Sequence, residues 1–98
     1  MTYAKLFVPA KVSKELHKSV RADMSKEFGG YTRYFASGGW VSDDNKLIEE
    51  TVIAYETYTD MSKTDTYSIM YDMATDIYQN SSELAVMFVI NHETHFIQ

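Results

Sequence analysis

Residues 28–58 constrain the fold more than any other part of this chain. Two stretches, 31–41 and 47–58, are rich in aromatic and β-branched residues, which is the composition of β-strands. The polar run SDDN at 42–45 lies between them, and Asp and Asn side chains bond their own backbone and tolerate left-handed φ angles. The segment therefore predicts a β-hairpin, against which the rest of the chain must pack.

The residues before the hairpin predict a strand followed by a helix. Residues 3–8 are apolar on both alternating sets, which indicates a central strand, and Pro9 ends it. Ser13 is a candidate N-cap, and Gly29-Gly30 supplies a left-handed stop. The helix over 14–28 carries an apolar stripe with a spacing of four, formed by Leu16, Val20, Met24 and Phe28.

The residues after the hairpin predict a second helix and a further strand. Thr64 can cap a helix from Asp65 to about Asn80, whose apolar positions recur at spacings of three and four. Residues 84–90 are apolar on both alternating sets, which predicts a strand. Residues 91–98 are expected to continue that strand as an extended tail.

The element order is β-α-β-β-α-β, which predicts an α+β fold of the ferredoxin-like type in a single domain over 1–98. Right-handed crossovers give a four-stranded antiparallel sheet with both helices on one face. The first and third strands are then central, and the first strand of the hairpin lies at an edge.

The other face of this sheet is expected to mediate self-association. Neighbouring residues of a strand point to opposite faces, so the runs at 52–55 and 84–90 place apolar side chains on the uncovered face as well. Exposed apolar patches of that kind usually mark interfaces. The sequence therefore predicts a homo-oligomer.

Composition excludes several classes of protein. The chain has no cysteine, which rules out disulfides and thiolate metal sites and fits a reducing compartment. The net charge of −5 argues against a nucleic-acid binder and permits a cationic ligand. No apolar run approaches the roughly 18 residues of a membrane span, and no signal peptide is visible. We expect a cytoplasmic protein without cofactor or metal.

The hairpin carries the candidate chemical site. Glu49 and Glu50 open its second strand, and because they are adjacent they point to opposite faces. Either could bind a cationic or hydroxylated ligand, or both could be a solvated strand start beside Lys46. Trp40 follows Gly38-Gly39, so its ring could stack on a base where the glycines admit a ligand, or it could cover the core edge.

The histidines and tyrosines are weaker candidates. His92 and His95 face opposite sides of an extended chain, so shared metal ligation with Glu93 is awkward. His17 sits beside the helix stripe and is expected at an interface or in solvent. Tyrosines such as Tyr34 pack at the core edge by default, although some could line a pocket.

The hairpin and the C-terminal strand resemble the small phage-encoded S-adenosylmethionine lyases, formerly called hydrolases. The resemblance lies in Gly38-Gly39-Trp40, in the EETVI sequence at 49–53, in the strand over 84–90 and in the ETH sequence at 93–95. It covers about 60 residues of the C-terminal part. Two features depart from the family pattern: a Trp where the family has Tyr, and a longer second helical region.

This resemblance implies a ferredoxin-like homotrimer with active sites between subunits, a phage origin, an anti-restriction role and the host cytoplasm as its location. It implies cleavage of S-adenosylmethionine to methylthioadenosine and homoserine lactone. Glu49 or Glu50 would be the key acid. Substrate contacts would come from Trp40, Tyr34, Gly39 and, from a neighbouring strand or subunit, Glu93.

Two other classes of function stay open on the sequence alone. One is a non-enzymatic phage or bacterial accessory protein that binds a nucleotide or a host protein. The other is an acidic decoy that occupies the nucleic-acid groove of a basic protein, as the negative net charge permits.

Overall fold

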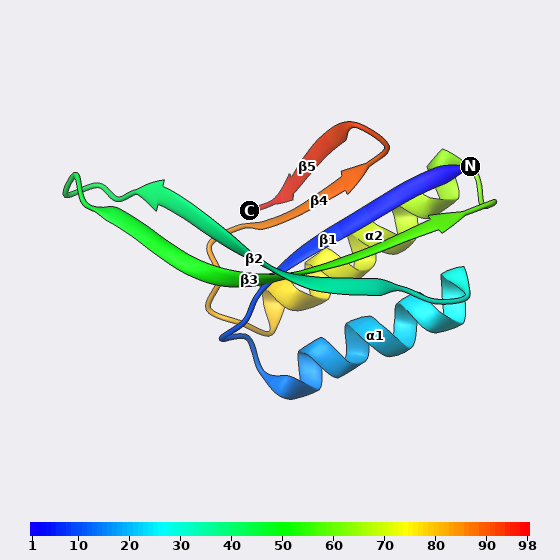
Figure 1. The fold of residues 1–98 in the computed structure, drawn as a ribbon, viewed down its shortest axis with the longest axis horizontal. Coiled ribbons are helices and arrows are strands. Elements are labelled where there is room, and N and C mark those ends of the chain that lie inside the picture. Colours follow the sequence, from blue (N-terminus) through cyan, green and yellow to red (C-terminus); the bar gives the residue numbers. More distant parts are fainter.

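The computed structural model describes residues 1–98 as two helices packed on a five-stranded antiparallel sheet (Figure 1). Along the chain the elements are β1 (Thr2–Pro9), α1 (Lys14–Phe28), β2 (Thr32–Val41), β3 (Leu47–Thr59), α2 (Lys63–Gln79), β4 (Val86–Ile90) and β5 (Glu93–Ile97). The strand order is β2-β3-β1-β4-β5, so β1 and β3 are interior and β2 is an edge strand, as predicted. Neither helix combines the length and apolarity that crossing a membrane requires.

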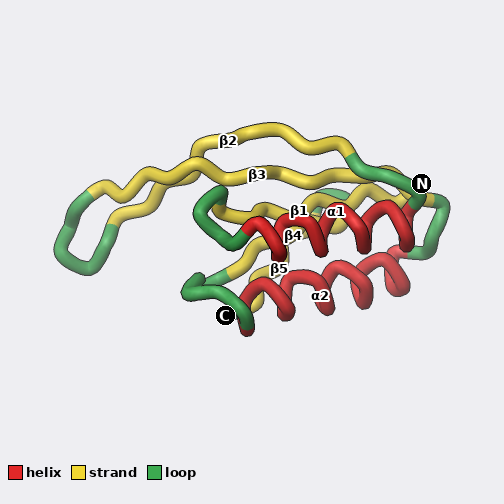
Figure 2. The backbone as a smooth tube through the Cα atoms, turned by 90° about the horizontal axis from the view of Figure 1, so that it is seen from below, coloured by secondary structure: helices red, strands yellow, loops and turns green.

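Both helices cover the same face of the sheet, and the opposite face has no covering layer (Figure 2). Alternate residues of β1, Ala4, Leu6 and Val8, are fully buried beneath the helices. The register places them opposite odd-numbered residues of β3 such as Tyr55. The even-numbered residues of β3, which include Glu50, therefore point to the open face.

The ends of the first helix agree with the sequence prediction, and the start of the second does not. Ser13 caps α1 by accepting a hydrogen bond from the backbone of Leu16, and Gly29 ends the helix at φ 86°. For α2 the N-cap is Ser62 rather than Thr64, because the Ser62 side chain accepts from the N–H of Asp65. The helix consequently starts at Lys63.

The prediction of four strands was wrong, because residues 93–97 form a fifth strand. Asn91 adopts a left-handed conformation at φ 55° and reverses the chain, so β5 pairs with β4 instead of extending it. The turn is anchored to β1: Asn91 donates its N–H to the carbonyl of Tyr3 at 2.7 Å, and its side-chain oxygen accepts the N–H of Tyr3 at 3.0 Å. A single asparagine thus converts the expected tail into an edge strand.

The fourth strand is shorter than predicted. It begins at Val86, and Leu84 lies outside it with 89% of its surface exposed. The segment between α2 and β4 therefore remains free to line a surface feature at this end of the sheet.

His17 was expected at an interface or in solvent, but it is 5% exposed. Its Nε2 lies 3.0 Å from the carbonyl oxygen of Pro9, and its Nδ1 lies 2.6 Å from the hydroxyl of Tyr55. A carbonyl can only accept, so Nε2 donates, and in a neutral ring Nδ1 then accepts from the tyrosine hydroxyl. Burial lowers the pKa of His17 below the usual 6.5, assisted by the charges of Arg21 and Arg33, and this favours the neutral ring.

This neutral histidine makes stability depend on pH. A group whose pKa is lower in the folded state contributes fully above its unfolded pKa of about 6.5, and this contribution is lost as the pH falls toward the folded value. Urea unfolding at about pH 7.5 and about pH 5.5 should show a smaller loss of stability for His17→Gln than for the wild type. The exposed His92→Gln variant is the control, and it should lose as much stability between the two pH values as the wild type. An equal loss of stability in all three proteins would contradict a neutral, buried His17.

The β2–β3 hairpin extends well past the helices as an arm (Figures 1 and 2). It gives the molecule an elongated form with principal extents of 44 × 27 × 23 Å. Its tip reverses as predicted: the N–H of Ser42 donates to the carbonyl of Lys46 at 2.8 Å, and Asn45 takes a φ of 65°. The arm curves over the end of the sheet where β1 finishes and β4 begins.

Candidate functional site

A cleft of about 440 Å³ lies where this arm passes the segment before β4. Seven residues line it: Lys11, Trp40, Glu50, Ser82, Glu83, Leu84 and Ala85. They come from the β1–α1 loop, from both strands of the arm and from the α2–β4 segment. The volume falls within the range of roughly 300–1,000 Å³ that is typical of small-molecule sites.

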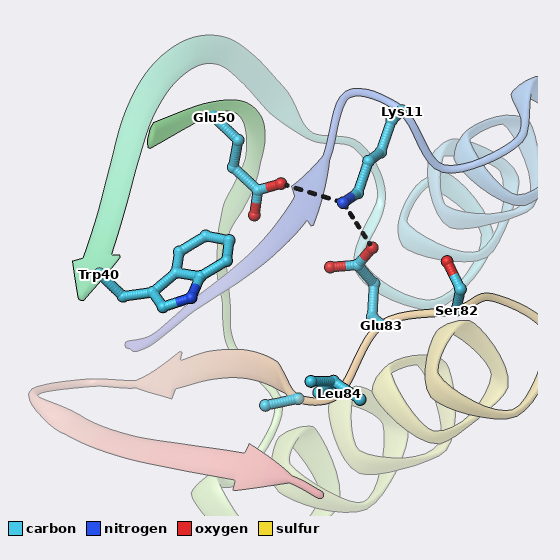
Figure 3. A pocket seen from close by; sticks show the side chains of 7 residues that line it. Lys11, Trp40, Glu50, Ser82, Glu83 and Leu84 are labelled. Carbon is cyan, nitrogen blue, oxygen red and sulfur yellow. Dashed lines mark ion pairs between the residues drawn. The ribbon is translucent and has the colours of Figure 1, made fainter. Parts of the chain in front are cut away.

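Two carboxylates and one ammonium group form the polar wall of the cleft (Figure 3). The Nζ atom of Lys11 lies 3.5 Å from Oε2 of Glu50 and 3.7 Å from Oε2 of Glu83. The side chains of Glu50 and Glu83 are 20% and 11% exposed, whereas that of Lys11 is 64% exposed. The side chains of both acids are therefore mostly buried, whereas that of the lysine is largely exposed to solvent.

Trp40 forms the aromatic wall. Its indole points into the same space as the Glu50 carboxylate, and Leu84 lies on the far side (Figure 3). The ring is 48% exposed, so one face is available to a ligand. Gly38 pairs with Glu50 in the register, and with no side chain there the space beside the glutamate stays open.

This arrangement suits a cationic ligand with a flat or apolar part. Counting charges, two glutamates and one lysine leave the cleft with one net negative charge. A carboxylate attracts an ammonium group, and an indole face attracts cations and stacks on flat rings. Ser82 supplies the one side-chain hydroxyl of the lining, and no histidine lies in it. The two carboxylates are suited to binding and orienting a cation.

Glu49 does not reach the cleft. It lies on the opposite face of β3 from Glu50, as the alternation of a strand requires, and is exposed. Gly39 pairs with Glu49 in the register, and a Cβ at that glycine would lie 3.6 Å from Cγ of Glu49. The structure therefore separates the two adjacent glutamates, with Trp40 and Glu50 on one face and Gly39 and Glu49 on the other.

Tyr34 lies on the open face but belongs to another cluster. It is six residues before Trp40 along β2, a distance of about 20 Å. Its hydroxyl lies 3.4 Å from Glu56, which also accepts the hydroxyl of Tyr3 at 2.5 Å. The Nζ atom of Lys5 lies 3.9 Å from Oε2 of Glu56. Hydrogen bonds with the hydroxyls of Tyr34 and Tyr3 raise the pKa of Lys5. The centre of the open face is consequently polar.

Glu93 also lies away from the cleft within the subunit. It opens β5, opposite the last residue of β4, whereas the cleft adjoins the segment before that strand. Its carboxylate accepts a hydrogen bond from Lys63, which lowers the pKa of Glu93. No group of three or more His, Asp and Glu side chains is placed to hold a metal ion.

Lys11 and Glu83 were not among the candidates chosen from the sequence. Glu83 follows the polar run that breaks α2, and Lys11 lies in the loop after Pro9; each reads locally as an ordinary surface residue. The only local signal for Glu83 is an acid placed directly before an apolar strand, which it shares with Glu50. Their proximity follows from the strand order, which brings the end of β1 and the first half of β3 next to the start of β4.

Two solved structures share this fold. A phage SAM lyase in complex with S-methyl-5'-thioadenosine aligns with a TM-score of 0.77 over 99% of this chain and 88% of its own, at 13% identity. A phage SAM lyase in the apo state aligns with a TM-score of 0.67 over the same shares, at 17% identity. No family model and no curated protein matches the sequence. The chain thus has the fold of the phage SAM lyases, which confirms the resemblance at the level of fold.

Proposed function

We propose that the chain binds S-adenosylmethionine in the cleft beside Glu50 and cleaves it to methylthioadenosine and homoserine lactone. One observation carries the proposal. This chain shares its fold with phage SAM lyases, and its own acidic, Trp-lined cleft lies at the strand of Glu49 and Glu50, which the sequence resemblance had identified. The activity belongs to those neighbours, and the cleft of this chain supplies the matching chemistry.

The charge of the ligand complements that of the cleft. S-adenosylmethionine carries an ammonium, a sulfonium and a carboxylate, so its net charge is +1, against −1 for Lys11, Glu50 and Glu83 together. Glu50 and Glu83 would accept the ammonium group between them. Lys11, whose side chain is the most exposed of the three, would turn to the substrate carboxylate. The face of Trp40 would take the adenine or the sulfonium.

The reaction needs positioning more than it needs a catalytic base. A carboxylate oxygen of the substrate attacks the γ-carbon, a C–O bond forms, and the C–S bond breaks with its electron pair going to sulfur. One cation and one anion disappear, so a cleft with less water favours the transition state relative to the ground state. Holding the methionine tail in attack geometry can contribute several kcal/mol. No proton is transferred in this step.

We also propose that the protein is a homo-oligomer that associates through the open face of its sheet, with a trimer favoured. Apolar side chains lie on that face with no covering layer, including Phe7, Val52, Met87, Val89 and Phe96. Trp40 lies on the same face and is half exposed, so a neighbouring subunit would close the cleft and complete its walls. Glu93 lies on the helix-covered side, opposite buried Ile90 and bonded to Lys63, so this mode of association would not bring it to the cleft.

Multi-angle light scattering at micromolar concentration tests this assembly. Wild-type protein should elute as an oligomer, and Phe96→Glu should shift it toward monomer because a charge is placed beside the apolar Met87 on that face. Tyr71→Glu replaces an aromatic of similar exposure on α2 and should leave the mass unchanged. A wild-type monomer would contradict the proposal.

Incubation of purified protein with S-adenosylmethionine tests the activity. Mass spectrometry should detect methylthioadenosine and homoserine lactone in equal amounts, well above a protein-free control. Equilibrium binding of S-adenosylmethionine without product would instead support a binding protein. If S-adenosylmethionine neither binds nor yields product, the proposed function is excluded.

A further inference from the structure

We propose that a second site, on the helix-covered side of the sheet, binds an anion of the phosphate class. The site is a hollow of about 270 Å³ between α1 and the sheet, lined by Ala10, Val12, Lys14, His17, Arg21, Arg33 and Ile53. It is separate from the cleft of Glu50, because Ile53 and Arg33 point to the face opposite Glu50. The proposal does not depend on the proposed lyase activity.

Both arginines of the chain line this hollow. Arg33 lies directly opposite Tyr55 in the β2–β3 register, which places it on the side of the helices. Arg21 approaches from α1, and its Nη1 lies 3.5 Å from the hydroxyl of Tyr55. Two guanidinium groups from different elements therefore line one hollow, one of them against the Tyr55 hydroxyl, and Lys14 adds a third positive charge to the lining.

None of these three cations pairs with a carboxylate. The ion pairs of the structure use Lys5, Lys11, Lys46 and Lys63, and no arginine takes part in one. This is unexpected for a chain with 14 acids and nine Lys or Arg residues. Three positive charges that line one hollow without a carboxylate partner repel one another, and a bound anion relieves that repulsion. The planar guanidinium offers paired donors that match phosphate oxygens.

The rest of the lining is consistent with an anion. His17 in the lining is buried, and this burial lowers its pKa with the help of the charges of Arg21 and Arg33, which favours the neutral ring. No acidic side chain lines the hollow, whereas the other hollow against α1 is lined by Asp23, Glu27, Asp72 and Asp76. The anion-attracting groups are therefore concentrated in one place. The volume exceeds that of a phosphate alone, so a phosphate carried by a nucleotide also fits the chemistry.

Arginine side-chain NMR tests the site directly, because the two Nε–Hε signals of the chain both belong to it. Inorganic phosphate, AMP and adenosine are titrated separately into ¹⁵N-arginine-labelled protein, with sodium chloride holding the ionic strength constant. Both signals should shift together and saturably with phosphate. A tighter response to AMP than to phosphate identifies a nucleotide ligand, and a response to phosphate alone identifies a free anion. Adenosine, which lacks the phosphate, should leave both signals in place.

Charge-removal variants complete the test. Arg33→Gln lies on an exposed edge strand, so it should fold normally, and it should weaken phosphate binding about tenfold or more. Lys26→Gln removes an exposed charge at the far end of α1 and should change the affinity less than about twofold. A non-saturable shift, or an equal effect of the two variants, would overturn the proposal by showing general charge screening only.

Discussion

Replacing Glu50 with Gln should reduce the rate of S-adenosylmethionine cleavage by about 100-fold, a loss typical of misplaced reacting groups. The amide keeps the size of the side chain but removes the negative charge that would hold the substrate ammonium. It also leaves Lys11 with Glu83 as its one carboxylate partner in the cleft. We therefore expect losses in both kcat and KM, measured as the initial rate of methylthioadenosine formation.

The neighbouring Glu49→Gln variant is the matched control. It makes the same chemical change one residue away, on the opposite face of β3, where the side chain is exposed. Its activity should stay within about threefold of the wild type, since surface substitutions usually have small effects. Full activity in both variants would show that neither glutamate takes part. A loss in Glu49→Gln alone would mean that the site lies on the other face of the arm.

Replacing Leu6 with Ala should destabilise the protein by about 2–5 kcal/mol. Leu6 is fully buried at the centre of β1, between β3 and β4 and beneath the helices. Removing its side chain leaves a cavity among residues that cannot all move to fill it, because both neighbouring strands fix the position of the backbone. The loss should appear as a lower urea midpoint with an unchanged slope.

Leu84→Ala provides the comparison for this second prediction. It deletes the same atoms from a side chain that is 89% exposed, so stability should change by less than about 0.5 kcal/mol. Because Leu84 lines the Glu50 cleft, this variant is a control for stability and not for substrate affinity. Comparable destabilisation by the two substitutions would mean that the segment before β4 packs into the core as the sequence had suggested.

The amino-acid sequence by itself determined the local elements and most of their order. The Gly29 stop, the Ser13 cap and the 42–45 turn act through bonds within a few residues, so each could be identified from its neighbours. The separation of Glu49 from Glu50 follows from strand alternation alone. The interior position of β1 follows from an apolar composition on both sides of that strand.

Only the tertiary structure decided which residues meet. The cleft joins Lys11, Glu50 and Glu83, which are more than 30 residues apart in sequence and are brought together by the strand order β3-β1-β4. The burial of His17 depends on the distant Tyr55 hydroxyl, and β5 depends on the contacts of Asn91 with Tyr3. Local propensity reports the conformation of a segment, whereas a site depends on long-range pairing and sheet twist, which no single segment encodes.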